Sequence, residues 1–352
     1  MSRVQVNPAF PLFLDDFQGR ARLGDFPPTG QILEPAEAPL RHLLRLCANT
    51  PRSRKELHEL IDDISSGEID AAVDTLLAAR VLVGEDDVAR LTRDERLSRQ
   101  ALFLSMFHPV ERVEAGLRDL SGLDVTVLGV GAIGGSCATQ LVTAGVRTLR
   151  LVDDDRVEWS NLHRQHLYTA EDVGAPKVAA AARALRRYQP GAEIRTLERR
   201  LTSAEDVAEA VAGADFVVNT VDTPQPHIRR WVNRACVEAG VPFVTGGFNQ
   251  HVGLIGPLVV PGETACLACQ ERQLAERYGR AELPTAENAG RVTPSFGPLC
   301  SAVAGLLAAE IIRYATGTGP CAIKGRTVYL DLLTLATTSR DFVRMSACGV
   351  CG

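Results

Sequence analysis

The sequence predicts an α/β protein, in which a Rossmann-like, doubly wound sheet follows a small winged-helix-like domain. The chain has 352 residues, 45% of them hydrophobic, which is enough for two domains with separate cores. Before residue 92, apolar residues recur at helical spacing, and from Asp124 onward compact apolar strands alternate with helices. We therefore expect domains at residues 1–92 and 93–352.

Composition excludes several classes of protein. The 38 basic and 43 acidic side chains give a formal charge of -5, so the overall charge does not favour nucleic acid or an anionic membrane as a partner. The first residues, MSRVQVNPAF, lack the pattern of a secretion signal. We find no apolar run near the roughly 20 residues of a membrane span. These features predict a cytoplasmic location.

The elements of the first domain follow in order. Residues 9–24 predict a short hairpin, and residues 38–50, 53–61 and 67–82 predict three helices by their spaced apolar residues. Residues 81–92 predict two short strands around a turn. Together they resemble a winged helix-turn-helix.

A winged helix often binds DNA, but this third helix is acidic. It carries Glu68, Asp70 and Asp74, with no basic residue before Arg80, so phosphates would repel it. A fold of this shape with an exposed strand edge can instead capture an extended peptide as an additional strand.

The second domain predicts parallel strands joined by helices. A small-residue helix follows the first strand, and another helix connects the last two. The predicted strands are residues 125–130, 148–153, 215–221 and 242–248, and the helices are residues 131–145 and 231–240.

A glycine-rich turn follows the first of these strands. Gly129, Gly131 and Gly134 form GxGxxG between a strand and a helix, where a helix N-terminus favours phosphate. Asp153 ends the next strand and can accept hydrogen bonds from ribose hydroxyls. Nicotinamide cofactors, flavin cofactors and ATP are all ligands that this pattern can bind. The alternative is a glycine-rich turn that binds no ligand.

Three charged residues narrow the choice of ligand. Arg164 and Lys177 follow the ribose-type aspartate, and Asp222 follows the strand at residues 215–221. Singly, each could be a surface charge or a turn cap. Together at the carboxyl ends of the strands, they favour cleavage of a triphosphate, with Asp222 as a ligand for Mg²⁺.

Nine cysteines include two close pairs, Cys266/Cys269 and Cys348/Cys351. Four thiolates at this spacing predict a closed structural Zn²⁺ site. A redox pair or unligated thiols are the alternatives.

The ordered motifs resemble the ThiF, MoeB and HesA adenylyltransferases, which are relatives of the ubiquitin-activating enzymes. The motifs are DERLSRQ, GVGAIG, LVDDDRVEWSNLHRQ, VGAPK, TVDTP, PGETACLAC, GLLAAEIIRYATG and CGVCG. The resemblance implies that ATP and Mg²⁺ activate a carboxylate as an acyl-adenylate and release pyrophosphate.

The resemblance also implies roles for individual residues. Asp153 holds the ribose, Lys177 contacts phosphates, and Asp222 serves Mg²⁺ and pyrophosphate departure. Arg99 matches an arginine that the second subunit supplies, which implies a homodimer. The residues implied to contact the nucleotide are Gly129, Gly131, Ala132, Gly134, Asp153, Asp155, Ser160, Asn161, Arg164, Lys177, Asp222 and Thr223. Ala132 and Thr223 depart from the residues common in the family.

Some relatives form a thioester after adenylation. Here the segment 285–298, which precedes the late helix, contains no cysteine, and the apolar neighbours of Cys137 and Cys300 predict burial. We therefore expect adenylation without a stable enzyme thioester.

The substrate remains open between several hypotheses. About 90 residues precede the family motifs, and their pattern is similar to the peptide-recognition element of enzymes that modify ribosomally made peptides, including MccB, which processes the microcin C precursor. The first hypothesis is adenylation of a precursor peptide. The others are activation of a sulfur-carrier protein ending in Gly-Gly, non-catalytic presentation of a peptide to another enzyme, and an oxidoreductase.

Overall fold

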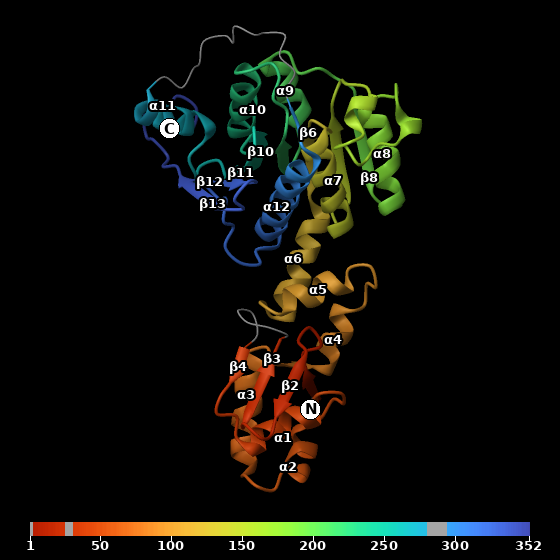
Figure 1. Ribbon diagram of the computed structural model, residues 1–352, viewed down its shortest axis with the longest axis vertical. Helices are drawn as coiled ribbons and strands as arrows, with labels where there is room; N and C mark the ends of the chain where they lie inside the picture. Colours follow the sequence, from red (N-terminus) through yellow and green to blue (C-terminus); the bar gives the residue numbers. More distant parts are fainter. Residues whose placement is uncertain (1–2, 25–30, 280–293) are drawn as a thin grey trace. The chain divides into compact units, whose positions relative to one another are not determined.

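The computed structural model describes residues 3–24, 31–279 and 294–352. The chain forms two compact units, residues 1–117 (unit 1) and 118–352 (unit 2), each described here by itself (Figure 1). The boundary expected at residue 92 lies within unit 1.

Unit 1 combines short strands with helices. The strands β2, β3 and β4 form an antiparallel sheet in that order, and β1 pairs with β5. The predicted hairpin and all three predicted helices are confirmed. The elements are β1 (Val4–Val6), β2 (Leu12–Asp15), β3 (Arg20–Leu23), β4 (Gln31–Leu33), α1 (Ala38–Cys47), α2 (Arg54–Leu60), α3 (Ser66–Ala78), β5 (Leu82–Gly84), α4 (Glu85–Leu91) and α5 (Ser98–Ser105), and α6 (Val110–Gly122) leads into unit 2.

Capping residues explain where α2 and α3 begin. Ser53 with Glu56, and Ser65 with Glu68, each form a complete capping box, which satisfies backbone N–H groups that the first helical turn leaves without partners. Two of the acidic residues of α3 form ion pairs, because Arg54 pairs with both Asp70 and Asp74. The apolar faces of the helices meet in one core, which includes Leu43, Leu44, Leu57, Ile69 and Val73.

The prediction of two strands at residues 81–92 was wrong in its second half. β5 forms as expected, but residues 85–91 are helix α4. The valines suggested extended structure, whereas Glu85, Asp86 and Asp87 occupy the first helical turn, where negative charge is favourable. Leu91, at the end of this helix, joins a small buried cluster with α5 and α6.

Unit 2 is built on an eight-stranded mixed sheet with the order β13-β12-β11-β10-β9-β6-β7-β8. Strands β8, β7, β6, β9 and β10 pair in parallel, and β11 to β13 extend the sheet in antiparallel pairs. The parallel strands β6, β7, β9 and β10 were predicted from the sequence, whereas β8 was not. The strands are β6 (Asp124–Leu128), β7 (Thr148–Val152), β8 (Glu193–Leu197), β9 (Phe216–Asn219), β10 (Phe243–Asn249), β11 (Val252–Val259), β12 (Arg326–Asp331) and β13 (Thr337–Asp341).

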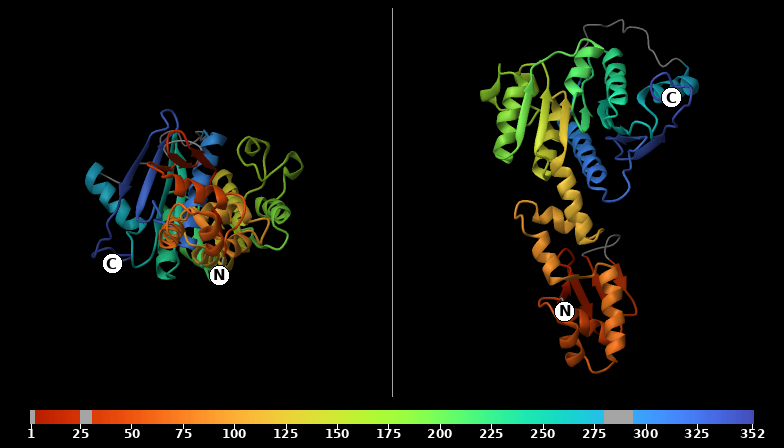
Figure 2. Two further views of the ribbon diagram at one scale, coloured as in Figure 1. Left: turned by 90° about the horizontal axis from the view of Figure 1, so that it is seen from below. Right: turned by 180° about the vertical axis from the view of Figure 1, so that it is seen from behind.

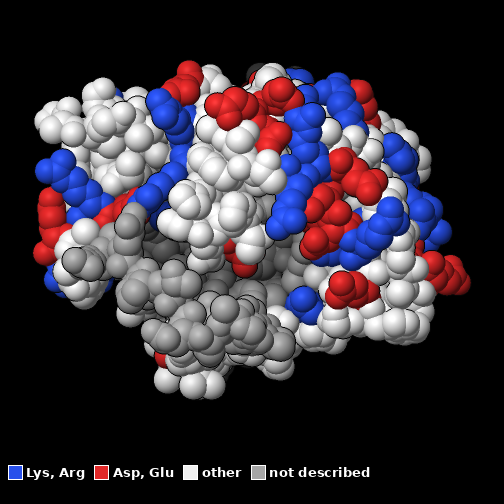
Figure 3. Space-filling model, turned by 90° about the horizontal axis from the view of Figure 1, so that it is seen from above, with Lys and Arg blue, Asp and Glu red and all other residues white. Residues whose placement is uncertain are grey.

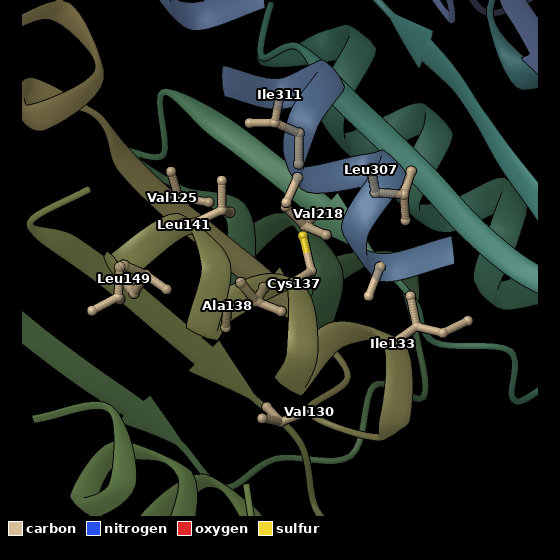
Figure 4. Close-up of a cluster of buried hydrophobic side chains, with 14 of the residues drawn as sticks. Val125, Val130, Ile133, Cys137, Ala138, Leu141, Leu149, Val218, Leu307 and Ile311 are labelled. Carbon is tan, nitrogen blue, oxygen red and sulfur yellow. The ribbon is translucent and has the colours of Figure 1, made fainter. Parts of the chain in front are cut away.

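Helices cover both faces of this sheet (Figure 1, Figure 2). α7, α8 and α12 pack on one face, and α9 and α10 pack on the other. Figure 4 shows Cys137, Ala138 and Leu141 of α7 beside Leu307 and Ile311 of α12 in the larger core. The helices are α7 (Ala132–Ala144), α8 (Lys177–Tyr188), α9 (Ala204–Val211), α10 (His227–Glu238), α11 (Leu267–Tyr278) and α12 (Gly297–Thr316), with short 3₁₀ turns η1 (Trp159–Asn161) and η2 (Ala170–Asp172).

Helix α12 corrects the expectation that no apolar run approaches the length of a membrane span. Its 20 residues are long and apolar enough for one by composition. Leu299, Val303, Leu307 and Ile311 are, however, buried in the core of unit 2. A helix buried at the centre of a folded domain is also apolar on most of its surface. The composition of α12 therefore matches its position in the core of unit 2.

Candidate functional site

The glycine turn between β6 and α7 is built by close backbone packing. Gly129 has φ +83, a conformation that glycine adopts without strain. A Cβ atom on Gly134 would collide with the carbonyl oxygen of Gly129 and lie 2.5 Å from Thr220 Oγ1. At Gly131, by contrast, a Cβ atom would meet only Gln165 Nε2, at 3.9 Å. Gly134 therefore serves packing, while Gly131 presents an open backbone, as expected for phosphate approach.

Val130, inside this turn, is held from two sides. Asp153, which follows β7, accepts a 2.7 Å hydrogen bond from the Val130 N–H, and the hydroxyl of Tyr168 donates a 2.6 Å hydrogen bond to the Val130 carbonyl. Burial raises the pKa of Asp153, an effect opposed by the charge of Lys177. The sequence predicted Asp153 but not Tyr168, whose phenol carries no charge and whose partner lies 38 positions away.

Lys177 opens helix α8 and is almost fully buried. Its Nζ atom donates a 2.6 Å hydrogen bond to Asp155 Oδ2, and the exposed fractions of the two side chains are 7% and 64%. The lysine predicted to contact phosphates therefore has a carboxylate partner within the loop that follows β7. Asp155, which was expected to contact the nucleotide, instead forms an ion pair with Lys177.

The loop SNLHRQ is fixed by its own polar contacts. Asn161 is buried at the end of η1, and its Oδ1 atom accepts a 3.1 Å hydrogen bond from the Glu158 N–H. Ser160 Oγ donates to Glu158 at 3.0 Å, and Arg164 Nη1 donates to the Ser160 carbonyl at 2.6 Å. These contacts preorganise the loop, so its remaining donors need little reordering on binding.

Gln165 is a further candidate that sequence reasoning did not single out. It is buried, its Oε1 atom has no hydrogen-bond partner among the described residues, and its amide lies beside the open face of Gly131. A buried polar atom without a partner commonly marks a site that a ligand or water completes. The only sequence signal for Gln165 was its position next to Arg164 in the motif SNLHRQ.

Asp222 and Thr223 lie in the loop that begins after β9, three and four residues beyond its last residue, Asn219, and both are exposed. Because β9, β6 and β7 are neighbours, Asp222, the glycine turn with Ala132, and Asp153 all follow the carboxyl ends of adjacent strands. Ligands bind at this edge in open α/β sheets. No described residue pairs with the Asp222 carboxylate, and an accessible carboxylate of this kind suits Mg²⁺ beside phosphate oxygens.

The surface charge is mixed. In the view from above, basic and acidic side chains stand next to one another on the visible face (Figure 3). This distribution agrees with the near balance of charge in the sequence and offers no broad basic patch among the described residues of that face.

Arg99 lies on α5 in unit 1, where it is exposed. Within the described residues its guanidinium has no bonded partner. Its contribution to a second subunit stays a prediction.

The four predicted cysteine ligands come together. Their Sγ atoms all lie within 4.8 Å of one another, with 3.7 Å between Cys266 and Cys348 and 3.5 Å between Cys269 and Cys351. Thiolates about 2.3 Å from a tetrahedral Zn²⁺ ion stand about 3.8 Å apart, so the geometry fits. Cys266, Cys269 and Cys351 are buried and Cys348 is half-buried. Burial raises the pKa of Cys269 to about 12, so a cation is needed to keep such a sulfur as a thiolate. The cluster therefore suggests zinc.

Other cysteines are poorly placed for chemistry. Cys137 and Cys300 are fully buried, as expected, and burial raises the pKa of both, that of Cys137 to about 12. Most of the segment 285–298, which contains no cysteine, lies outside the described residues.

Comparison with known proteins gives consistent results. A model described as the ThiF family matches residues 98–350. The sulfur carrier protein ThiS adenylyltransferase of Escherichia coli is 34% identical over 239 residues, covering 67% of this chain and 89% of the relative. The corresponding Bacillus subtilis protein is 39% identical over 176 residues, which is about half of each chain.

A solved structure matches over nearly the full length. The structure of E. coli MccB with AMPCPP and selenomethionine MccA aligns with a TM-score of 0.83 and 22% identity, covering 99% of this chain and 100% of that one. At this identity the likeness establishes the fold, including the small N-terminal domain.

Proposed function

We propose, on the premise that this chain belongs to the ThiF family of adenylyltransferases, that its substrate is a ribosomally made precursor peptide. The observation that carries this proposal is the N-terminal unit. The family model begins at residue 98, yet the fold match to MccB extends across the preceding residues too. A recognition domain in front of an adenylation domain suits a substrate that must be captured before it is activated.

The adenylation itself follows from the charges of unit 2. A carboxylate oxygen of the substrate attacks the α-phosphorus of ATP, the bond to the bridging oxygen breaks, and pyrophosphate leaves. Arg164 and Lys177 stabilise the negative charge that grows on the phosphate oxygens. Asp222 would hold Mg²⁺, which supplies further positive charge to those oxygens. No protein nucleophile is needed, since positioning lowers most of the barrier.

The sheet of unit 1 offers a surface for an extended peptide. Phe13, Arg22 and Ile32 lie opposite one another on β2, β3 and β4, with Phe13 44% and Ile32 53% exposed. The Arg22 guanidinium stands 4.4 Å from the centre of the Phe13 ring, and its buried Nε atom has no partner among the described residues. A peptide strand added at either edge would continue this row of apolar and cationic side chains.

Two further parts of the proposal concern assembly and location. A second copy of the chain would supply Arg99 to the site of the first, in a homodimer. A zinc-bound set of thiolates and further free thiols suits the reducing cytoplasm.

The second candidate is activation of a sulfur-carrier protein with a Gly-Gly terminus. It is favoured by the sequence relatives, which are named for the carrier ThiS. Under this hypothesis unit 1 would serve another role, such as dimerisation.

Pyrophosphate exchange distinguishes the two substrates. The full chain is incubated with Mg²⁺-ATP, labelled pyrophosphate and either a short peptide encoded next to its gene or a Gly-Gly carrier protein. We expect exchange with the peptide, which Arg22→Glu weakens and Asp222→Ala abolishes. Exchange with the carrier alone would replace the peptide proposal, and exchange that survives in full in Asp222→Ala would remove the assigned role of this residue.

A further inference from the structure

The lysine expected to contact phosphate is held in an unusual way. Its side chain is 7% exposed, whereas that of its partner Asp155 is 64% exposed. An ammonium group removed from water needs a hydrogen-bonded counter-charge. Asp155 supplies it at 2.6 Å from Nζ, and its backbone carbonyl also accepts a 2.9 Å hydrogen bond from the Lys177 N–H. The aspartate therefore fixes both the start of α8 and the end of the lysine side chain.

The same aspartate is tied to the glycine turn. The Asp155 N–H donates a 2.9 Å hydrogen bond to Asp153 Oδ1, and Asp153 Oδ2 accepts from the Val130 N–H at 2.7 Å. A continuous series of hydrogen bonds thus joins the turn predicted to face phosphates with the cation predicted to contact them. Residues 156–157 and 174–176 brace the series, because Arg156 pairs with Pro176 and the Val157 N–H donates to the Ala175 carbonyl.

We propose that Asp155 is a positioning residue that acts through Lys177, holding the ammonium group in place for the negative charge that grows on the phosphate oxygens in the transition state. This inference rests on the proposed adenylation but not on the identity of its substrate. An ammonium group has three donors. Asp155 engages one of them, so two remain for phosphate oxygens while the aspartate keeps the group from turning away.

The proposal differs from two simpler roles for an acidic residue in this loop. If Asp155 bound the ribose, its loss would raise KM for ATP. If it were a Mg²⁺ ligand, in line with the grouping of Asp153, Asp154 and Asp155, added Mg²⁺ would restore activity. A group that only aims a cation at the transition state instead lowers kcat and leaves KM nearly unchanged.

The test measures kcat and KM for ATP in pyrophosphate exchange, with the peptide or carrier that supports exchange in the wild type. We expect Asp155→Asn to lower kcat on the order of 10- to 100-fold, with KM for ATP within about twofold of wild type and no rescue by raised Mg²⁺. Asp155→Glu, which keeps the carboxylate, should recover most of the rate. Asp154→Asn is the matched control, because Asp154 is an exposed neighbour in the same loop, and it should behave as wild type.

A double substitution checks that the effect passes through the lysine. In a Lys177→Met background, Asp155→Asn should cause no further loss of kcat. Additive losses, a rise in KM, rescue by Mg²⁺, or an unchanged kcat in Asp155→Asn would each overturn the inference. Absence of exchange in the wild type with both substrates would instead count against the proposed function.

Discussion

The backbone of Gly134 packs so closely against Gly129 that a Cβ atom on Gly134 would overlap the carbonyl oxygen of Gly129. This contact sets the distance between α7 and the end of β6, and so the shape of the turn. The two glycines of the motif that follow Gly129 consequently have different functions, one structural and one open to ligand.

Substitution separates these functions. Gly134→Ala should lower the free energy of unfolding by roughly 1–3 kcal/mol, because the extra methyl group forces the helix from the strand. Gly131→Ala should leave the melting temperature near that of wild type but weaken ATP binding, because its Cβ atom would project into the open face of the turn. Thermal unfolding and calorimetric ATP titration measure the two effects. Equal melting temperatures for both variants would contradict the assignment.

Tyr168→Phe tests the second support of the turn. The substitution leaves the Val130 carbonyl buried without its 2.6 Å partner, which should cost roughly 1–3 kcal/mol of unfolding free energy. ATP affinity should fall as well, because the N–H of Val130 donates a hydrogen bond to Asp153, the residue expected to hold the ribose. Tyr188→Phe, at an exposed tyrosine of α8, is the control and should change neither property. Loss of stability with unchanged ATP affinity would show that Tyr168 serves the core alone.

Much of this site could be predicted because its signals are local. Gly129, Asp153 and Asp222 each stand at the end of a strand, and the period of the apolar residues is enough to locate strand ends. Tyr168 and Gln165 were missed because their roles depend on contacts across the fold and on groups that carry no charge. Helix α4 was missed for a different reason, since Val81, Val83 and Val88 favour extended structure, and the signal for a helix was the favourable negative charge of its first turn, Glu85 to Asp87.

The capping box of α2 gives a pH prediction for unit 1. Hydrogen bonds from the backbone N–H and hydroxyl of Ser53, with a smaller contribution from Arg3, lower the pKa of Glu56 to about 2 from an ordinary 4.5. A carboxyl group whose pKa is lower in the folded state stabilises the fold above its unfolded pKa, and this stabilisation is lost as the pH falls from 4.5 towards 2.

Glu56→Gln should therefore increase amide hydrogen exchange in residues 53–60 at neutral pH, with a difference from wild type that narrows as the pH falls through this window. Glu59→Gln is the control on the same helix, because Glu59 makes a 3.7 Å contact with the exposed Lys55. If the difference in hydrogen exchange between Glu56→Gln and wild type stayed constant with pH, the negative charge of Glu56 would not be what stabilises the helix.

The cysteine cluster links metal content to folding. The purified protein should contain about one zinc per chain, as four-thiolate sites do. Cys266→Ser should remove the zinc and lower the melting temperature, because the cluster joins α11 to the residues after β13 and the binding free energy of a structural metal contributes directly to folding. Cys321→Ser, outside the cluster, should retain the metal and melt close to wild type. A strong chelator should reproduce the Cys266→Ser loss in the wild type and add nothing to the variant. Full stability of metal-free protein would mean that the four thiols are held together by packing around them, with no structural part for zinc.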